Sequence, residues 1–306
     1  MTISADPRTT FIAAAIWHGG LDQAGAMLAT YPELANSGIH IAAILGDDTT
    51  VRRFLAYDPG NAIVRAGPYG GDALVYLCLS KYLRLDRARS GGFLRAATAL
   101  LDAGADPNTG FWTTGQHPER ETALYGAAGV AHHPELTRLL LERGANPNDG
   151  EAVYHSPETY QNDAMKLLVE TGQLTSDNLV MLLIRKHDWH DYEGAKYLLA
   201  NGADPNGSRS RGWLPLHHAL ARDNALRMFE LLLDHGADPT SVSGGRSAIG
   251  LAAREGRGDV LELIERRGFP VELHGADRLI AACARGDASA ARAIAEREPH
   301  LVREVL

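Results

Sequence analysis

One short string recurs four times along the chain and constrains its fold more than any other feature. Each copy is a Leu-rich run, then Gly-Ala, then Asp or Asn with Pro, and the copies begin at Leu100, Leu139, Leu198 and Leu231. A Leu-rich run is typical of the buried side of a helix, and the Gly after it can adopt the left-handed conformation that ends a helix. The residue before Pro avoids the helical region, and Asp and Asn side chains bond to the local backbone. Each copy therefore predicts a helix, its end and a turn.

A second string precedes these helices and completes the pattern. It is clearest at Thr122–Ala128 (Thr-Ala-Leu-Tyr-Gly-Ala-Ala) and at Leu214–Ala219 (Leu-Pro-Leu-His-His-Ala). With both strings, the chain resembles the ankyrin repeat family, whose repeats begin in Thr-Pro-Leu-His-x-Ala-Ala and end in Leu-Leu-x-x-Gly-Ala-Asp-x-Asn. The resemblance implies an all-α fold, an ankyrin-repeat solenoid of antiparallel helix pairs with hairpin-like finger loops.

The opening string sets a register for the whole chain. The residues at its Leu position are Ile12, Ile39, Leu74, Leu124, Val153, Leu179, Leu216, Ile249 and Leu279. Their mean spacing is close to the ankyrin period of about 33 residues. We therefore expect residues 1–306 to form a single ankyrin-repeat array of about nine repeats, degenerate at both ends. The expected repeats cover roughly 10–36, 37–64, 72–108, 122–148, 151–174, 177–206, 214–240, 247–272 and 277–306.

The charge balance and the cysteines limit the functional classes. The formal charge of −8 argues against an electrostatic nucleic-acid binder, which needs a basic surface. Cys78 and Cys283 lie far apart, so we expect no disulfide framework and a reducing compartment. The apolar run Phe11–Trp17 is too short for a membrane span and lacks a basic lead-in, so neither a signal peptide nor an anchor is predicted. The expected location is the cytoplasm.

The third repeat carries a basic insertion, Lys81–Gly92, in an otherwise acidic chain. Two interpretations remain open. Arg84, Arg87 and Arg89 would suit a partner with an acidic or phosphorylated patch, or the insertion lengthens a helix whose charged face is solvated.

Two long finger loops place aromatic residues outside the regular repeat. The loop Thr109–Arg120 carries Phe111, Trp112 and His117, and the loop Gly207–Trp213 ends in a second tryptophan. Exposed aromatic side chains are unusual unless they cover something. They therefore either pack onto the neighbouring finger or anchor a ligand.

The most chemically varied stretch is Lys186–Tyr192, an insertion in the sixth repeat. One helical turn would place His187 and His190 on the same side, where imidazoles and carboxylates suit proton transfer, substrate clamping or a metal. A metal would need a third ligand from another repeat, so no metal site is predicted; polar inter-helix turns are also routine in repeat proteins. No phosphate or dinucleotide fingerprint is present, so we predict no cofactor. The candidate catalytic residues are His155, Arg185, His187, Asp188 and His190.

Four other histidines are expected to have structural or solvent-facing roles. His40 and His217 lie in or beside the family's own His position, which predicts hydrogen bonds to the adjacent turn. His132 and His133 precede Pro134 in the turn between two helices, which predicts exposure to solvent.

The function implied by the resemblance is a protein-interaction module that binds a partner in its concave groove, chiefly across repeats three to seven. The alternative is an enzyme or small-molecule-binding protein, with a pocket under the finger loops and the insertions of the same repeats. The expected binding residues are Trp112, His117, Tyr154, Tyr160, Trp189, Trp213, His218, Arg84, Arg87 and Arg89.

Overall fold

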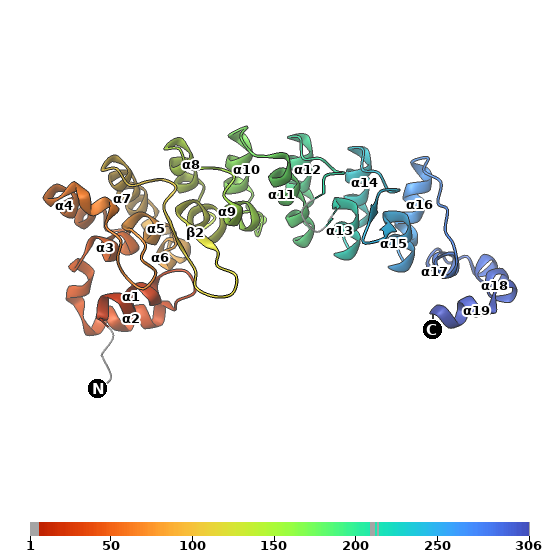
Figure 1. The fold of residues 1–306 in the computed structure, drawn as a ribbon, viewed down its shortest axis with the longest axis horizontal. Coiled ribbons are helices and arrows are strands. Elements are labelled where there is room, and N and C mark those ends of the chain that lie inside the picture. Colours follow the sequence, from red (N-terminus) through yellow and green to blue (C-terminus); the bar gives the residue numbers. More distant parts are fainter. Residues whose placement is uncertain (1–5, 209–211, 213, 306) are drawn as a thin grey trace. The chain divides into compact units, whose positions relative to one another are not determined.

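The repeated strings of the sequence coincide with paired helices in the computed structural model, which describes residues 6–208, 212 and 214–305. Two modules are distinguished: the N-terminal module, Met1–Leu174, and the C-terminal module, Thr175–Leu306. Within each module, the helix pairs follow one another in chain order (Figure 1).

In the N-terminal module, the first helices of successive pairs pack side by side, α1 on α3, α3 on α5 and α5 on η4. The second helices form their own row, with α4 on α7 and α8 on α10. The elements are α1 (Pro7–Ala15), α2 (Leu21–Thr30), η1 (Pro32–Asn36), α3 (Ile39–Leu45), α4 (Asp48–Tyr57), η2 (Pro59–Ile63), α5 (Ala73–Cys78), α6 (Lys81–Leu85), η3 (Arg87–Arg89), α7 (Ser90–Asp102), β1 (Gly110–Trp112), β2 (Arg120–Thr122), η4 (Tyr125–Val130), α8 (Pro134–Glu142), α9 (Gly150–His155) and α10 (Asp163–Glu170).

The C-terminal module repeats this two-row arrangement. First helices α11, α13, α15 and α17 pack in succession, and second helices α12, α14 and α16 do the same. The elements are α11 (Ser176–Asp188), α12 (Tyr192–Ala200), α13 (Pro215–Ala221), α14 (Leu226–Asp234), β3 (Val242–Ser243), β4 (Arg246–Ser247), α15 (Ala248–Arg254), α16 (Gly258–Arg266), α17 (Ala276–Ala284), α18 (Ala288–Arg297) and α19 (Pro299–Val305).

The Gly-Ala strings end the second helices as the sequence predicts. Gly144 follows α8 with a φ of 94°, which favours glycine because it has no Cβ. The amide of Ala145 then donates to the Leu140 carbonyl at 2.9 Å, so the chain turns back over the last helical turn. Leu140 itself is fully buried.

Asparagines in two of the regular turns tie each of those turns to the next one. The side-chain oxygen of Asn108 accepts from the Asn146 amide at 2.8 Å, and its side-chain nitrogen donates to the Gly144 carbonyl at 3.0 Å. Asn206 makes the same two bonds, from the Asp238 amide at 2.7 Å and to the Gly236 carbonyl at 2.8 Å. Successive turns within a module are therefore linked through backbone groups.

The finger loops are antiparallel hairpins where the structure describes them. Strand β1 pairs with β2, and β3 pairs with β4 across Gly244 and Gly245. Both glycines have positive φ, 60° and 79°, as a tight two-residue hairpin turn requires. The predicted finger Gly207–Trp213 falls partly outside the described residues, and Trp213 lies outside them altogether.

The insertion of the third repeat differs from the single longer helix that we considered. It forms the short helix α6, the 3-10 turn η3 and then α7, with the break at Asp86. The Asp86 carboxylate accepts from the Ala88 amide at 3.2 Å and pairs with Arg89 at 3.1 Å, which favours a cap over continued helix. The expectation of one longer helix was wrong for this reason.

The two cysteines and the helix lengths complete the description. Cys78 is buried, Cys283 is exposed, and both are free thiols. Among residues 6–208, 212 and 214–305, no helix combines the length and apolar character needed to cross a membrane.

Candidate functional site

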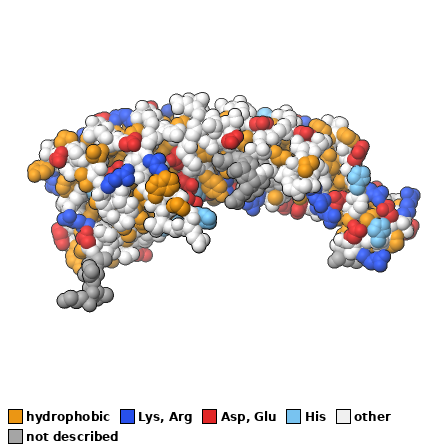
Figure 2. All heavy atoms as spheres, in the orientation of Figure 1, with side chains coloured by type: hydrophobic (Ala, Val, Ile, Leu, Met, Phe, Trp, Pro, Cys, Tyr) orange, Lys and Arg blue, Asp and Glu red, His pale blue; other side chains and the backbone are white. Residues whose placement is uncertain are grey.

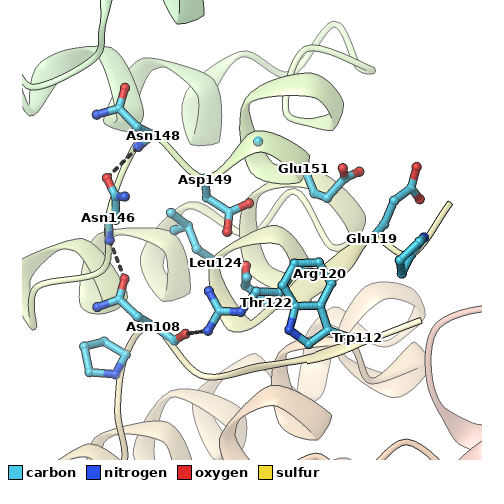
Figure 3. A pocket seen from close by; sticks show the side chains of 13 residues that line it. Asn108, Trp112, Glu119, Arg120, Thr122, Leu124, Asn146, Asn148, Asp149 and Glu151 are labelled. Carbon is cyan, nitrogen blue, oxygen red and sulfur yellow. Dashed lines mark hydrogen bonds between the residues drawn. The ribbon is translucent and has the colours of Figure 1, made fainter. Parts of the chain in front are cut away.

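A pocket of about 430 Å³ lies beside the β1–β2 finger of the N-terminal module (Figure 3). The finger supplies one part of its wall, and the start of α9 and two inter-repeat turns supply the rest. The lining residues are Pro107, Asn108, Trp112, Pro118, Glu119, Arg120, Thr122, Leu124, Asn146, Asn148, Asp149, Gly150 and Glu151.

Successive side chains of a strand point to opposite faces, and this decides which aromatic side chain of the finger is exposed. Phe111 is 2% exposed and stacks on Tyr69, with ring centroids 5.0 Å apart. The next residue, Trp112, points the other way and is 64% exposed. Phe111 therefore packs inward, as the first alternative predicts, whereas Trp112 remains on the surface at the pocket.

The pocket is rich in carboxylates. Glu119 comes from the finger, and Asp149 and Glu151 come from the start of α9 (Figure 3). Asp149 caps α9 by accepting from the Ala152 amide at 2.8 Å, and burial raises the pKa of its carboxyl. The cation in the lining, Arg120, donates to the Asn108 carbonyl at 2.7 Å.

Glu121 is the most unusual acid of this region. It is 2% exposed on β2, and no hydrogen-bond partner for its Oε2 exists among the described residues. Burial, together with the negative charges of Glu151 and Glu119, raises the pKa of its carboxyl to about 7. Protonation therefore changes near neutral pH at this carboxyl.

His155 at the end of α9 lies beside the same acidic group. Its Nδ1 is 3.0 Å from Glu158 and its Nε2 is 3.4 Å from Glu151. Burial alone would lower the pKa of His155, but the bonds to Glu151 and Glu158 raise it to about 9. The imidazole is therefore a cation at neutral pH, which does not favour the expected role in proton abstraction.

In the C-terminal module, Asp188 gathers several of the predicted residues. Its Oδ1 lies 2.8 Å from His218 Nε2 and 2.5 Å from Arg222 Nε, and its Oδ2 pairs with Arg185. Burial opposes ionisation, but His218 and the two arginines outweigh it and lower the pKa of Asp188 to about 2. This carboxylate joins α11 to α13 and is ionised at neutral pH.

The sequence predicts that His187 and His190 lie on the same side of one helix. In the structure they do not. Helix α11 ends at Asp188, and His190 follows it in a left-handed conformation with φ 51°. His187 is 0% exposed, and neither ring nitrogen has a hydrogen-bond partner among the described residues, whereas His190 is exposed. Burial, and then the nearby His218, lower the pKa of His187 to about 3.

The other predicted binding residues divide between the modules. In the N-terminal module, His117 and Tyr160 are exposed, and Tyr154 packs edge-on against His155 with ring centroids 4.9 Å apart. In the C-terminal module, Trp189 is partly buried just after α11.

The basic insertion is largely engaged by its own module. Arg87 donates to the Ala131 carbonyl at 2.8 Å, and Arg89 pairs with Asp86. Arg84 is exposed and has no ion-pair partner among the described residues. On the face shown in Figure 2, basic and acidic side chains are interspersed.

The histidine predictions had mixed outcomes. His40 bonds to the Val64 carbonyl at 2.8 Å and His217 to the Arg246 carbonyl at 2.9 Å, which confirms their structural role. His133 is buried, against expectation, because its Nδ1 accepts from the Leu136 amide at the start of α8 and its Nε2 bonds to the Ser90 hydroxyl.

Sequence reasoning missed the acidic pocket. Glu119, Asp149 and Glu151 are of a residue type that is common on protein surfaces, and only their position around the Trp112 finger and the start of α9 could have signalled them. In the part of the chain that the structure describes, no group of His, Cys, Asp or Glu side chains is arranged to hold a metal ion.

Comparison with known proteins gives a consistent picture. A family model described as ankyrin repeats, in three copies, matches residues 180–277. The human ASB11 ankyrin repeat domain is similar in structure, with a TM-score of 0.58 and 23% identity over 76% of this chain and 99% of that one. The Bcl-3 ankyrin repeat domain has a TM-score of 0.48 and 22% identity over 76% and 87% of the two chains.

A sequence relative is Protein glp-1 of Caenorhabditis elegans, which is 29% identical over 182 residues. The match covers 52% of this chain. It spans only 14% of that relative's length.

Proposed function

Since the chain is an ankyrin-repeat protein, we propose that its N-terminal module binds a partner protein at the pocket beside the β1–β2 finger. Ankyrin-repeat domains are generally protein-interaction modules. In such a module, the first helices and fingers supply the partner-facing groove. The pocket lies at this place in the repeat, between a finger and the start of a first helix.

The observation that carries the proposal is the exposure of Trp112 at the rim of a polar pocket. An indole that is 64% exposed leaves a large apolar surface in water. Tryptophan is among the residues that contribute most to binding energy when a partner buries it. Phe111 beside it is packed inward, so the finger holds Trp112 from a fixed base.

Three finer expectations belong to this proposal. Residues 1–306 are proposed to form one continuous array, and the cytoplasm is the proposed location. An acidic partner for the Arg84 insertion stays a prediction, and the contacts of Arg87 and Arg89 weaken its basis. His155 and Asp188 are both held in ion pairs with neighbouring side chains. Neither arrangement favours the enzyme alternative.

The proposal is tested by site-specific photo-crosslinking. Benzoylphenylalanine is placed at Trp112 in the full chain and, as a matched control, at Tyr57, an exposed aromatic residue at the end of the second helix α4. We expect a discrete protein adduct from position 112 and none from position 57. The captured protein is then identified, purified and titrated against the intact chain.

In that titration, Trp112→Ala should weaken binding by at least about tenfold, the usual cost of truncating an interface tryptophan. Identical adducts from both positions, or an unchanged affinity of the purified partner for Trp112→Ala, would contradict the proposal.

A further inference from the structure

The second helix of the last repeat does not pack as the earlier second helices do. The main contacts of α18 are with α17 and α19 (Figure 1), whereas α12, α14 and α16 pack on one another in succession. Ile294 is the one large aliphatic residue of α18, most of whose other positions are alanine, and no residue of this helix is buried. In α14, by contrast, Phe229 and Leu232 are fully buried. A helix surface of alanines leaves space that larger side chains would fill.

A groove of about 240 Å³ remains along α17, bordered by α18 and by the loop that follows α16. Its aliphatic lining comes from all three segments: Val271 and Leu273 of the loop, Ala281 and Ala282 of α17, and Ala290 and Ile294 of α18. Val271, Leu273 and Ile294 are only partly buried, so the groove offers apolar surface to a guest.

Two arginines flank this apolar lining. Arg278 and Arg285 also line the groove, and they are seven residues apart, with Ala281 and Ala282 between them. Seven residues are close to two helical turns, so the two arginines lie on one side of α17, about 10 Å apart along its axis. Their side chains are 39% and 25% exposed, so a guest in the groove can reach them.

The acids of the chain leave both guanidiniums incompletely satisfied. Glu298 accepts from Arg278 Nη2, and Glu265 lies 3.1 Å from Arg285 Nη2 without the alignment of a hydrogen bond. Arg278 Nε, Arg285 Nε and Arg285 Nη2 are buried and find no acceptor within the part of the chain that the structure describes. Buried donors without an acceptor are costly, and an incoming carboxylate would offset that cost.

The acid in the lining is directed elsewhere. Asp287 caps α18, where its carboxylate accepts from the Ala290 amide at 2.9 Å. A cationic guest would meet the two guanidiniums of α17, whereas an anionic one would pair with them. The groove therefore combines an aliphatic lining with two separate positions for a negative charge.

We infer that this groove binds a helical segment of a partner protein, in which two acidic side chains seven residues apart flank an aliphatic one. On such a helix, all three side chains lie on one face, with the same spacing as Arg278, the alanines and Arg285. The volume of about 240 Å³ is below the range of pockets that enclose small ligands, roughly 300–1,000 Å³, which favours an inserted side chain. This site lies in the C-terminal module and does not depend on the proposed Trp112 site.

The test uses the intact chain and fluorescent alanine-based peptides of about fifteen residues, a length at which such helices begin to form. The first peptide has leucine between two glutamates that are seven residues apart. A twin has glutamine in place of both glutamates, and a second twin has the glutamates on the opposite face of the helix. Affinities are measured by fluorescence anisotropy.

Three variants separate recognition from a structural role. Arg278→Gln with Arg285→Gln removes both guanidiniums. Glu298→Gln with Glu265→Gln disrupts the same internal ion pairs but keeps both arginines. Arg292→Gln removes an exposed arginine of α18 that lies outside the lining. Melting curves show whether each variant is folded.

We expect the first peptide to bind at least about tenfold more tightly than either twin, and at least about tenfold more weakly to the arginine double variant. Binding should be unchanged in Arg292→Gln and retained or stronger in the glutamate double variant, because its arginines are released from internal acids. If the arginine double variant does not fold, the three peptides and the glutamate double variant still decide.

Equal binding of the three peptides, or unchanged affinity in a folded arginine double variant, would overturn the inference. An equal loss in both double variants would assign the arginines a structural role only. Decanoate that binds as tightly as the first peptide and displaces it would also contradict a partner helix, since the groove would then take a free aliphatic carboxylate. None of these outcomes bears on the cross-linking from position 112.

Discussion

The two modules each bury an ionisable side chain with an unpaired polar atom, but the two groups have opposite chemistry. Among these groups, the N-terminal module buries the acid Glu121, and the C-terminal module buries the base His187. Burial disfavours the charged form of both. The pKa of Glu121 is therefore raised to about 7, and the pKa of His187 is lowered to about 3.

The neighbours strengthen this difference. Glu151 and Glu119 add negative charge around Glu121, whereas His218 and His190 add positive charge around His187, which Asp188 only partly offsets. The same repeat architecture thus responds to pH according to the few side chains that its fingers and turns enclose.

The direction of each effect follows from proton binding. Between about pH 4.5 and 7, folded Glu121 holds a proton that the unfolded chain releases, so the N-terminal module loses stability as pH rises. Between about pH 6.5 and 3, folded His187 stays neutral while the unfolded chain takes up a proton, so the C-terminal module loses stability as pH falls. The modules should therefore respond in opposite directions in mildly acidic solution.

The largest expected effect is the loss of unfolding free energy when a buried leucine is truncated. No titratable group is involved, so it is a reference for the pH-dependent effects. Leu140→Ala removes a fully buried core side chain and should cost about 2–5 kcal/mol, whereas Ile294→Ala, half-buried in α18, should cost less. Neither loss should depend on pH. Urea unfolding of both variants gives the values, and equal losses would mean that the end of the chain is packed as tightly as its centre.

The next effect belongs to the acid. Glu121→Gln keeps the shape of the side chain and removes its charge, so it should stabilise the N-terminal module by about 2–3 kcal/mol near pH 8 and by little near pH 5. Hydrogen-exchange protection of fragments from this module, in the intact chain, measures the change. Glu142→Gln, on the surface, is the control.

A stabilisation of Glu121→Gln that is the same at both pH values would show that this carboxyl does not titrate as described. The comparison with His187 would then fail on its acidic side.

The smallest effect belongs to the base. His187→Leu replaces a buried imidazole whose nitrogens have no partner among the described residues, and it should remove a loss of about 2 kcal/mol that the C-terminal module suffers near pH 5. The readout is exchange protection of fragments around α11 at two pH values. His190→Leu, at the neighbouring exposed position, should leave the acid sensitivity in place.

Acid sensitivity that persists unchanged in His187→Leu would assign it to other groups. Asp188 would be the first of these, since its depressed pKa also favours the folded state only while the carboxyl is ionised.

The fold was predictable because its determinants are local and repeated. A Leu run specifies a helix, a glycine such as Gly144 ends it, and the Asp or Asn that follows specifies a turn. All three signals lie within a few residues. The register from the opening strings located the helix pairs. The break of the basic insertion at Asp86 was missed. An aspartate can either stay in a helix or cap a new one, and only the local geometry decides which.

The site was less predictable because burial depends on distant partners. His133 is enclosed by Ser90, and Glu121 is enclosed near Glu151, both far away in sequence. One local signal for His133 was available: it precedes Pro134 at the first position of a helix, which is where a capping side chain is expected. For Glu121, the only signal was the alternation of side chains along the finger strands. It places Glu121 on the inward face, opposite to the exposed Trp112.

The asparagine links between turns bear on how such a chain changes length over generations. Asn108 recognises only main-chain groups of the following turn, at Asn146 and Gly144, and Asn206 does the same at Asp238 and Gly236. A duplicated or deleted gene segment of one whole repeat would therefore carry its own asparagine and its own receiving backbone. The asparagine hydrogen bonds at both junctions would then be retained without any change at these positions.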